Sequence, residues 1–421
     1  MLQTVGWRLR PGPLLERCRD RYGDAFTLHP LPRETAVVLS HPDAVKEVFT
    51  GDPRLLHAGE ANVILLPLLG RHSVLLLDEQ AHMTQRKLML PAFHGERMAR
   101  YEELIASVTE RELERWPARE PISLIERMQA ITLEVIVGAV FGVRGEQRQA
   151  EMRERLRETL DMTGDLRAVL ALFILGPERM YDSRYFQREL DPVNELVLDE
   201  IRRRREELDL HERDDVLSML LGARHEDGRP MSDSELRDEL MTLLVAGHET
   251  TATALAWAIE RLVRHPEKLE RLASEAAAGD DAFADAVAKE TLRLRPVIPM
   301  VVRKLQEPME LGGRLLPAGV AVAPSIYLMH RRPDVYPDPA AFRPERFLER
   351  PAGTYTWIPF GGGVRRCLGA TFALFEMRVV LATLVTRLRM RPAAARSERV
   401  VRRTPITLAP AQGAEVVVEP L

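Results

Sequence analysis

The chain has 421 residues, of which 45% are hydrophobic and 29% are charged, and its formal net charge at pH 7 is −4. This composition can fill a large core and lacks the basic excess typical of nucleic-acid-binding proteins, so nucleic acid is not an expected partner. The longest apolar run, Ala168 to Leu175, is shorter than the roughly 18 residues that a membrane-spanning helix needs, and no membrane anchor is predicted.

The first 15 residues have no continuous apolar core and no small-residue cleavage site, so the sequence predicts a cytoplasmic protein without a signal peptide. The chain has two cysteines, Cys18 and Cys367, and we expect no disulfide between them. No linker, repeat or charge block divides the sequence, which predicts one domain over residues 1–421.

Apolar residues recur with helical spacing through most of the chain. Helices are expected at Tyr101 to Trp116, Leu124 to Phe141, Pro192 to Leu208, Ser232 to Arg264 and Leu368 to Leu388. Short β signals lie nearer the ends, where Asp24 to Leu28 and Ala36 to Leu39 are predicted to pair, and where Gly319 to Ala323 and Val416 to Val418 are further candidates. The predicted fold class is mainly α with small β-sheets.

The helix expected from Ser232 begins with a capping box, in which Ser232 and Glu235 can satisfy each other's end groups. Its middle, AGHETTATAL, contains Gly247 and the hydroxyl residues Thr250, Thr251 and Thr253. A glycine inside a helix costs about 1 kcal/mol relative to alanine, so a requirement other than helix stability is expected to explain this segment.

Two pairs of charged or titratable residues have helical spacing. Glu290 and Arg293 in KETLRLRP are three residues apart, so that their charges can meet on one helix face. His82 and Arg86 in HMTQR are one turn apart and can reach the same ligand. On most helices such pairs are exposed to solvent and stabilise little.

The segment Phe360 to Gly369 reads FGGGVRRCLG and runs into an apolar-periodic stretch. Cys367 is expected to open that helix, where the positive end of the dipole and the neighbouring Arg365 and Arg366 favour a thiolate. The glycines around it would let a flat ligand approach the sulfur. The alternative is that Cys367 is a small buried hydrophobic residue.

The pattern FxxGxRxCxG, at Phe360, Gly363, Arg365, Cys367 and Gly369, resembles the haem-ligand loop of the cytochrome P450 family. The resemblance implies haem b between a long distal helix and the proximal helix that follows the cysteine loop. It also implies that Cys367 is the axial thiolate, that Phe360 packs beside the sulfur, and that Arg365 pairs with a haem propionate. A thiolate ligand pushes electron density onto the iron and favours O–O cleavage.

The segment from Ala246 to Thr250 is similar to the oxygen-binding groove of this family. By that resemblance Ala246 and Gly247 leave room over the iron, Thr250 hydrogen-bonds the bound oxygen, and Glu249 feeds protons toward it. The family often has Asp at the position of Glu249. The alternative for Thr250 is a local bond to the carbonyl four residues earlier.

Glu290 and Arg293 match the ExxR helix of the family, and FRPERF supplies a third member, Arg346. The resemblance implies a buried structural triad on the proximal side of the haem. It also implies that His82, Arg86 and Arg303 bind haem propionates, with an exposed surface histidine as the alternative for His82.

The resemblance places the substrate pocket at Ile64 to Leu77, Leu170 to Tyr181, Leu243 with Ala246, and Val297 to Val302, where Ile298, Met300 and Val301 are the candidate contacts. These residues are nearly all aliphatic, which favours a fatty acid, alkane, terpenoid or steroid, although ordinary core has the same composition.

The sequence therefore predicts a haem-thiolate monooxygenase that inserts one atom of O2 into a C–H bond of a hydrophobic small molecule. The chain carries no cluster-type cysteine run or flavin module, so a separate ferredoxin and ferredoxin reductase are the expected partners of a monomer. Candidate docking residues are Arg366, Lys87, Arg97 and Arg100. The alternatives are a peroxygenase driven by hydrogen peroxide and a haem-binding sensor or carrier without turnover.

Overall fold

The computed structural model describes residues 6–7, 9–29, 35–93, 97–162, 166–208, 210–404 and 406–421. The chain divides into two compact units. Unit 1 comprises Met1–His57, Ile105–Ile131 and Thr250–Leu421, and unit 2 comprises Ala58–Leu104 and Thr132–Glu249. The expectation of a single domain over residues 1–421 remains a prediction.

Unit 1 contains a five-stranded sheet in the order β1-β2-β8-β5-β3. Its strands are β1 (Ala25–Leu28), β2 (Ala36–Leu39), β3 (Leu56–His57), β5 (Arg303–Leu305) and β8 (Ala321–Pro324). The predicted pairing of the first two strands is confirmed, because Ala25 lies opposite Leu39 in an antiparallel register. The third candidate strand is β8, which runs parallel to β2.

The helices α2 (Pro11–Tyr22) and α3 (Pro42–Thr50) contribute to separate cores that include opposite sides of β2. Val37 and Leu39 pack in the core that contains Val45 of α3. Val38 packs in the core that contains Cys18 of α2. Successive side chains of a strand point to opposite faces, and this is why all four residues of β2 are buried and apolar.

The described residues of unit 1 form three smaller sheets, of which one places β12 (Glu415–Pro420) between β4 (Pro121–Ser123) and β9 (Leu388–Pro392). The fourth candidate strand lies in β12. The other two sheets are hairpins made by β6 (Met309–Leu311) with β7 (Arg314–Leu316), and by β10 (Val400–Arg402) with β11 (Leu408–Pro410).

The helices α14 and α15 of unit 1 pack against α18, and α17 packs against α15. Their bounds are α14 (Pro266–Ala277), α15 (Ala282–Leu294), α16 (Ile326–Met329), α17 (Arg346–Glu349) and α18 (Ala370–Arg387). The helix expected from Leu368 thus begins at Ala370, with Gly369 at its N-cap.

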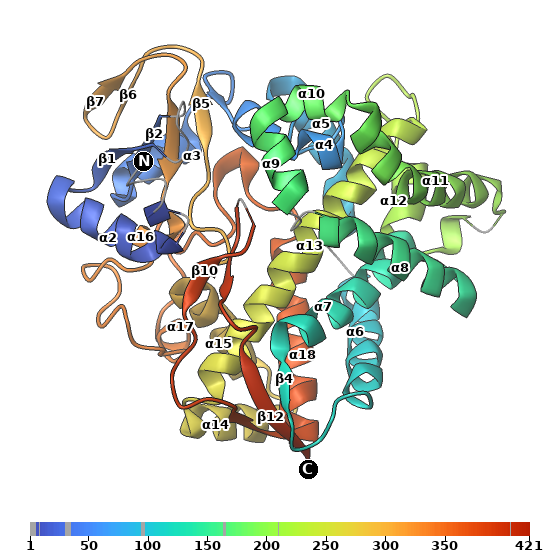
Figure 1. The fold of residues 1–421 in the computed structure, drawn as a ribbon, viewed down its shortest axis with the longest axis vertical. Helices are drawn as coiled ribbons and strands as arrows, with labels where there is room; N and C mark the ends of the chain where they lie inside the picture. The colour runs from blue at the N-terminus through green and yellow to red at the C-terminus, as the bar shows by residue number, and fades with distance from the viewer. Residues whose placement is uncertain are drawn as a thin grey trace. The chain divides into compact units, whose positions relative to one another are not determined.

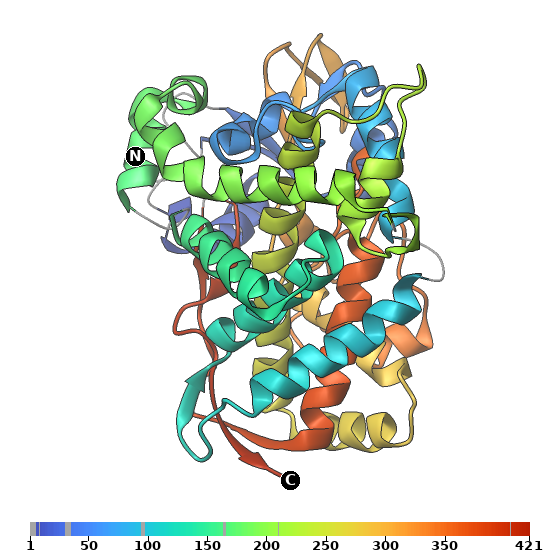
Figure 2. The same cartoon turned by 90° about the vertical axis from the view of Figure 1, so that its right-hand side faces the viewer.

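The described part of unit 2 is helical. Its elements are the 3₁₀ turns η1 (Glu60–Leu65), η2 (Leu90–Phe93) and η4 (Leu210–Glu212), the π-helix η3 (Val137–Phe141), and the helices α4 (Leu66–Leu69), α5 (Glu79–Met89), α8 (Glu146–Met162), α9 (Leu166–Leu175), α10 (Pro177–Tyr181), α11 (Arg184–Glu206) and α12 (Val216–Gly222). Figure 2 shows α11 in light green along its full length.

Three helices cross from one unit to the other along the chain: α6 (Arg97–Leu113), α7 (Leu124–Ile136) and α13 (Asp233–Leu262). Figure 1 and Figure 2 both show α13 as one uninterrupted helix, and it has 30 residues. Its predicted capping box is confirmed, since the backbone N–H of Ser232 donates to Glu235 Oε2 at 2.8 Å and the N–H of Glu235 donates to Ser232 Oγ at 3.2 Å.

Several predicted helix boundaries are wrong. The helix expected over Tyr101 to Trp116 spans Arg97–Leu113. The helix expected to start at Pro192 starts at Arg184, with the proline inside it. Burial of Leu190, Val193 and Val197 on one face offsets the hydrogen bond that the proline cannot donate. The helix expected from Leu124 to Phe141 becomes a π-helix after Ile136, which widens its last turn.

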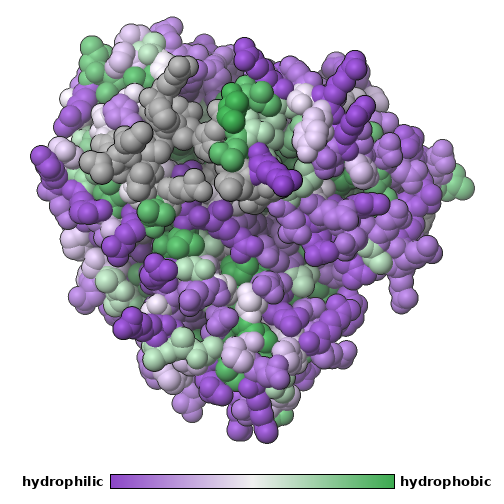
Figure 3. All heavy atoms as spheres, viewed as in Figure 1, coloured by the Kyte–Doolittle hydropathy of each residue, from purple (hydrophilic) through white to green (hydrophobic). Residues whose placement is uncertain are grey.

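On the face drawn in Figure 3 the described residues are mostly hydrophilic, and the hydrophobic ones form small separate groups. Among the described helices, none combines the length and the apolar character needed to cross a bilayer.

Candidate functional site

The loop that carries Cys367 lies in unit 1 and is closed by one backbone hydrogen bond. The N–H of Cys367 donates to the carbonyl of Phe360 at 2.9 Å, across the single 3₁₀ turn Gly363–Arg365. Cys367 is exposed, whereas Cys18 is buried in the core beneath α2. Cys367 comes just before the N-terminus of α18, where its accessible thiol can serve as a ligand.

Two glycines of this loop have left-handed backbone conformations, with φ of +67° at Gly361 and +65° at Gly363. A Cβ atom at Gly363 would overlap the carbonyl oxygen of Phe49, and one at Gly362 would overlap the Phe49 ring. Phe49 lies in the last turn of α3, which ends at Thr50, so the loop lies directly on that helix. Glycine is needed here both for the turn and for the close approach.

Phe360 is held from the side by an aromatic cluster. Its ring centroid lies 5.9 Å from that of Trp357, in the edge-to-face arrangement that aromatic pairs prefer. The indole N–H of Trp357 donates to the carbonyl of Lys289 in α15 at 3.2 Å. This bond ties the beginning of the loop to α15.

The predicted triad is assembled and buried. Arg293 Nε and Nη2 donate to the two oxygens of Glu290 at 2.7 and 2.8 Å, and Arg346 Nε lies 3.2 Å from the same carboxylate. Glu290 and Arg293 have no exposed surface, and Arg346 is 8% exposed. The backbone N–H of Arg343 is a fourth donor to Glu290, at 2.8 Å.

His330 connects this triad to the cysteine loop, a link that the sequence did not indicate. Its carbonyl accepts a hydrogen bond from Arg293 Nη1 at 2.8 Å, and its Nε2 accepts the N–H of Ile358 at 2.9 Å. Burial, with a smaller contribution from the charge of Arg293, lowers the pKa of His330 well below its ordinary value. The ring is therefore neutral and can accept this hydrogen bond.

Arg303 and Arg365, two of the predicted propionate ligands, line the same pocket of unit 1. Arg303 is buried in β5, and Arg365 is partly buried in the cysteine loop. The other lining residues are Val48, Phe49, Gly51, Pro53, Leu56, Gly362 and Val364. Among the described residues around this pocket, the two arginines are the charged ones, and guanidinium groups suit carboxylates such as propionates.

The predicted pocket residues Ile298, Met300 and Val301 are partly buried and pack against the two sheet cores. Val301 also lies against the cysteine loop, since its Cγ1 is 3.5 Å from the Cβ position of Gly361. The structure thus brings Val301 to the loop. Whether the three residues contact a substrate remains a prediction.

The middle of α13 is incompletely buried. Ala246 is exposed, and Leu243, Gly247 and Thr250 are partly buried at i, i+3, i+4 and i+7 spacing. Glu249 is also partly buried, whereas every residue from Thr251 to Val263 is buried. The space beside Gly247 is open except for Ile136, whose Cδ1 is 3.4 Å from the Cβ position.

His82 and Arg86 lie one turn apart on α5 of unit 2, as predicted. His82 is 3% exposed, which contradicts the alternative of an exposed surface histidine. Of the proposed docking residues, Arg366 is exposed and Lys87 forms an exposed ion pair with Glu226 at 3.0 Å. The side chains of Arg97 and Arg100 lie outside the described residues.

These residues fit a planar, anionic iron cofactor on two observations. Unit 1 offers an accessible thiol on a loop with glycines at 361–363 and 369, and beside that loop a small pocket lined by Arg303 and Arg365. The helix α13 offers a partly open stretch over residues 243–250, in which Leu244 and His248 are buried and the other residues are not. Sequence reasoning missed Phe49, His330 and the contact of Thr132 with His248, because these are tertiary contacts without a local pattern.

Comparison with known proteins agrees with this geometry. The family model described as Cytochrome P450 matches residues 2–418. The chain is 44% identical over 391 residues to cytochrome P450 135B1 of Mycobacterium tuberculosis, covering 91% of this chain and 82% of that protein. It is 40% identical over 405 residues to cytochrome P450 135A1 of the same species, covering 92% and 90%. Among solved structures, retinoic acid-bound cyanobacterial CYP120A1 shares the fold, with a TM-score of 0.85, 24% identity, and coverage of 100% of this chain and 96% of that one.

Proposed function

The chain belongs to the cytochrome P450 family, whose members are haem-thiolate monooxygenases, and from this premise we propose that it hydroxylates a hydrophobic small molecule such as a fatty acid, terpenoid or steroid. The observation that carries the substrate class is the face of α13 formed by Leu243, Ala246, Gly247 and Thr250, which is apolar apart from one hydroxyl. Such a face can contact a hydrocarbon but has little means of fixing a polar molecule.

The cofactor is protohaem with an axial cysteine, and we assign that position to Cys367 because its thiol is exposed at the glycine loop. We assign the propionates to Arg303 and Arg365, which line one pocket, and to His82 and Arg86 on α5. When bound, the haem supplies the chemistry that activates O2, so that one oxygen atom enters the C–H bond and the other leaves as water.

Thr250 and Glu249 are proposed to deliver protons. Their positions are adjacent on α13, next to the least buried turn of the helix. The hydroxyl of Thr250 would donate a hydrogen bond to O2 in the loaded enzyme, and the partly buried carboxyl of Glu249 would pass protons toward that hydroxyl. Because Gly247 has no side chain, the space beside it on α13 is open except for Ile136.

Electrons are proposed to come from a separate ferredoxin and its reductase, with the protein acting as a cytoplasmic monomer. The exposed Arg366 beside Cys367, together with Lys87, is a candidate contact for an acidic partner. A peroxygenase is the second candidate, and the presence of both Glu249 and Thr250 disfavours it because a peroxide-driven enzyme has less need of proton delivery. The family assignment also disfavours a haem-binding sensor or carrier without turnover, because members of the family are monooxygenases.

A spectroscopic titration followed by turnover tests this proposal. The oxidised protein is titrated with fatty acids, terpenes and steroids, and a shift of the haem from low to high spin identifies ligands. Each ligand is then incubated either with a ferredoxin, its reductase and NADPH, or with hydrogen peroxide alone. We expect hydroxylated product in the first reaction. Product from peroxide alone would establish the peroxygenase, and spin shifts only with polar compounds would contradict the substrate class.

A further inference from the structure

Thr132 of α7 contacts both the side chain and the backbone of His248 on α13. Its Oγ1 lies 3.0 Å from His248 Nδ1 and 3.2 Å from the carbonyl oxygen of His248. Thr132 has no exposed surface and His248 is 5% exposed. A hydroxyl in this position replaces water for two polar groups of one residue.

The two contacts of Thr132 with His248 are satisfied together by one tautomer of the ring. A threonine hydroxyl has a single hydrogen, which Thr132 donates to the carbonyl oxygen of His248. With that hydrogen on the carbonyl, the contact at 3.0 Å suits a ring whose Nδ1 carries the hydrogen and donates to Thr132 Oγ1. Thr132 thus contacts the ring and the backbone of His248 together, which restrains the orientation of the ring.

A second residue of α7 contacts Gly247, which directly precedes His248 on α13. Ile136 lies one turn after Thr132, on the same face of α7, and its Cδ1 is 3.4 Å from the Cβ position of Gly247. The two α7 residues therefore contact two consecutive residues of α13. Both contacts come directly before Glu249 and Thr250 in the chain.

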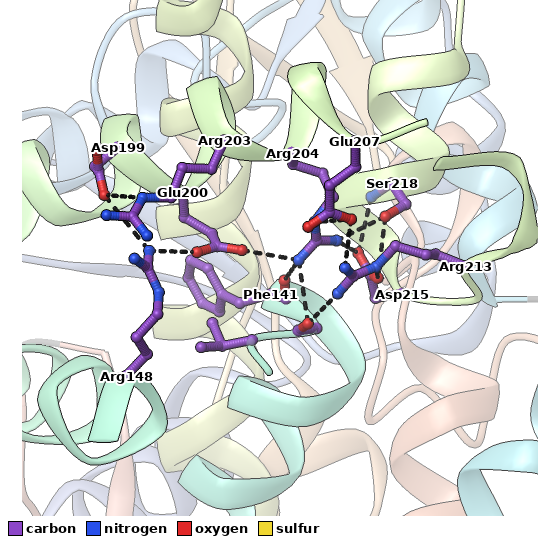
Figure 4. A network of polar contacts seen from close by, with 12 residues as sticks. Phe141, Arg148, Asp199, Glu200, Arg203, Arg204, Glu207, Arg213, Asp215 and Ser218 are labelled. Carbon is purple, nitrogen blue, oxygen red and sulfur yellow. Dashed lines mark hydrogen bonds and ion pairs between the residues drawn. The ribbon is translucent and has the colours of Figure 1, made fainter. Parts of the chain in front are cut away.

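The C-terminal end of the helical stretch that begins with α7 is held by a buried ionic network (Figure 4). After Ile136 the chain forms the π-helix η3, and the carbonyls of Phe141 and Gly142 at its end accept hydrogen bonds from Arg204 Nη2 at 3.0 and 3.1 Å. Arg204 has no exposed surface, and its charge is balanced by Glu200 at 2.9 Å and Asp215 at 2.7 Å. A second arginine, Arg213, also donates to the Gly142 carbonyl.

We propose that Thr132 is a positioning residue for proton delivery: through His248 it fixes the turn of α13 that carries Glu249 and Thr250. This inference rests on the proposed role of that pair. Each residue of a helix is turned by about 100° from the last, so a small rotation at His248 would redirect both following side chains. Misplacement of a catalytic group by 1 Å can cost about a hundredfold in rate.

The test replaces Thr132 by valine, which keeps its shape and removes its hydroxyl. In the holoenzyme with a turnover substrate, T132V is expected to release about three- to tenfold more hydrogen peroxide per NADPH oxidised. The thiolate Soret band and the substrate dissociation constant from the spin shift are expected to stay unchanged. T132S, which restores the hydroxyl, is expected to restore coupling, and H248N, which keeps a donor near the place of Nδ1, is expected to stay near wild type.

The matched control is T109V. Thr109 is also fully buried on a helix, but among the described residues its hydroxyl donates to the Ile105 carbonyl of its own helix, at 2.7 Å, and to no other element. Unchanged coupling in T109V with lost coupling in T132V supports the proposal. Equal peroxide release from both variants, or wild-type coupling in T132V, would overturn it.

Two further measurements separate this inference from the proposed function. If Thr132 acts through Thr250, the double variant T132V/T250A is expected to release no more peroxide than T250A, and additive effects would contradict the proposal. In the ferrous carbon monoxide complex, ¹⁵N NMR of labelled histidine is expected to show His248 with hydrogen on Nδ1, and to lose that signature in T132V. A third outcome is that T132V changes the NMR signature of His248 while T250A couples normally. The contact between Thr132 and His248 would then stand, and the role of Thr250 in proton delivery would be refuted.

Discussion

Gly363 faces the backbone of Phe49 so closely that a Cβ atom on it would overlap the Phe49 carbonyl oxygen. This contact seats the cysteine loop on the end of α3. The loop glycine at Gly361 has nearly the same left-handed φ, +67° against +65°, but meets only Val301 at 3.5 Å. A side chain at Gly361 would therefore meet backbone strain alone, whereas one at Gly363 would meet both backbone strain and steric overlap.

Gly363→Ala is expected to lose haem or to fold poorly, because it adds an overlap with immovable backbone to the strain of a left-handed residue. Gly361→Ala carries only that strain, about 1 to 2 kcal/mol. Haem content and the thermal midpoint of both purified variants check this. Equal losses in the two variants would mean that the contact with Phe49 does not matter.

Cys367→Ala is expected to abolish the thiolate-type, red-shifted Soret band of the reduced carbon monoxide complex. Cys18→Ala is the control, because that thiol is buried between α2 and the sheet and is expected to leave the spectrum unchanged. An unaltered band in Cys367→Ala would remove the assignment of the axial ligand.

Thr250→Ala is expected to keep haem and substrate binding and to divert electrons to hydrogen peroxide, lowering product per NADPH by about tenfold or more. Thr253→Ala, at a position of the same helix that is 1% exposed, is expected to lower stability and leave coupling intact. Product and peroxide are measured against NADPH consumption. Full coupling in Thr250→Ala would refute the role in proton delivery.

Glu290→Ala is expected to destabilise the protein by about 3 to 5 kcal/mol, because it leaves the buried charges of Arg293 and Arg346 without their partner. The control is Glu349→Ala, which removes an exposed ion pair with Arg343 and is expected to cost less than about 1 kcal/mol. Denaturant unfolding measures both. A small effect of Glu290→Ala would contradict a structural role for the triad.

The free energy of unfolding is expected to fall as the pH rises, because the buried carboxyl of Glu376 must ionise. Burial raises the pKa of this α18 carboxyl from 4.5 to about 8, and among the described residues none donates to its Oε1. A raised folded-state pKa gives stability that is fully present below pH 4.5 and is lost as the pH rises through about 8. At about 1.36 kcal/mol per unit, the loss is at most about 5 kcal/mol.

Glu376→Gln is therefore expected to be as stable as wild type at pH 5 and more stable at pH 9. The exposed Glu114→Gln is expected to match wild type at both values. Thermal unfolding at the two pH values checks this. A Glu376→Gln variant that loses stability with pH as steeply as wild type would show that another group titrates.

The sequence alone determined what local chemistry dictates. The capping box at Ser232 placed the start of α13, the ExxR spacing placed Glu290 beside Arg293, and FGGGVRRCLG identified the cysteine loop. These features depend on residues a few positions apart, and a repeat of 3.6 or a fixed turn brings them together wherever the helix lies.

Tertiary structure alone decided the contacts between distant segments. Phe49 lies beneath Gly363, His330 joins Arg293 to the loop at Ile358, and Thr132 meets His248, although each pair is far apart in the chain. The start of α11 before Pro192 and the π-helix after Ile136 were misjudged for the same reason. Burial and packing against other elements outweighed local propensity there, and a single sequence does not state which surfaces will meet.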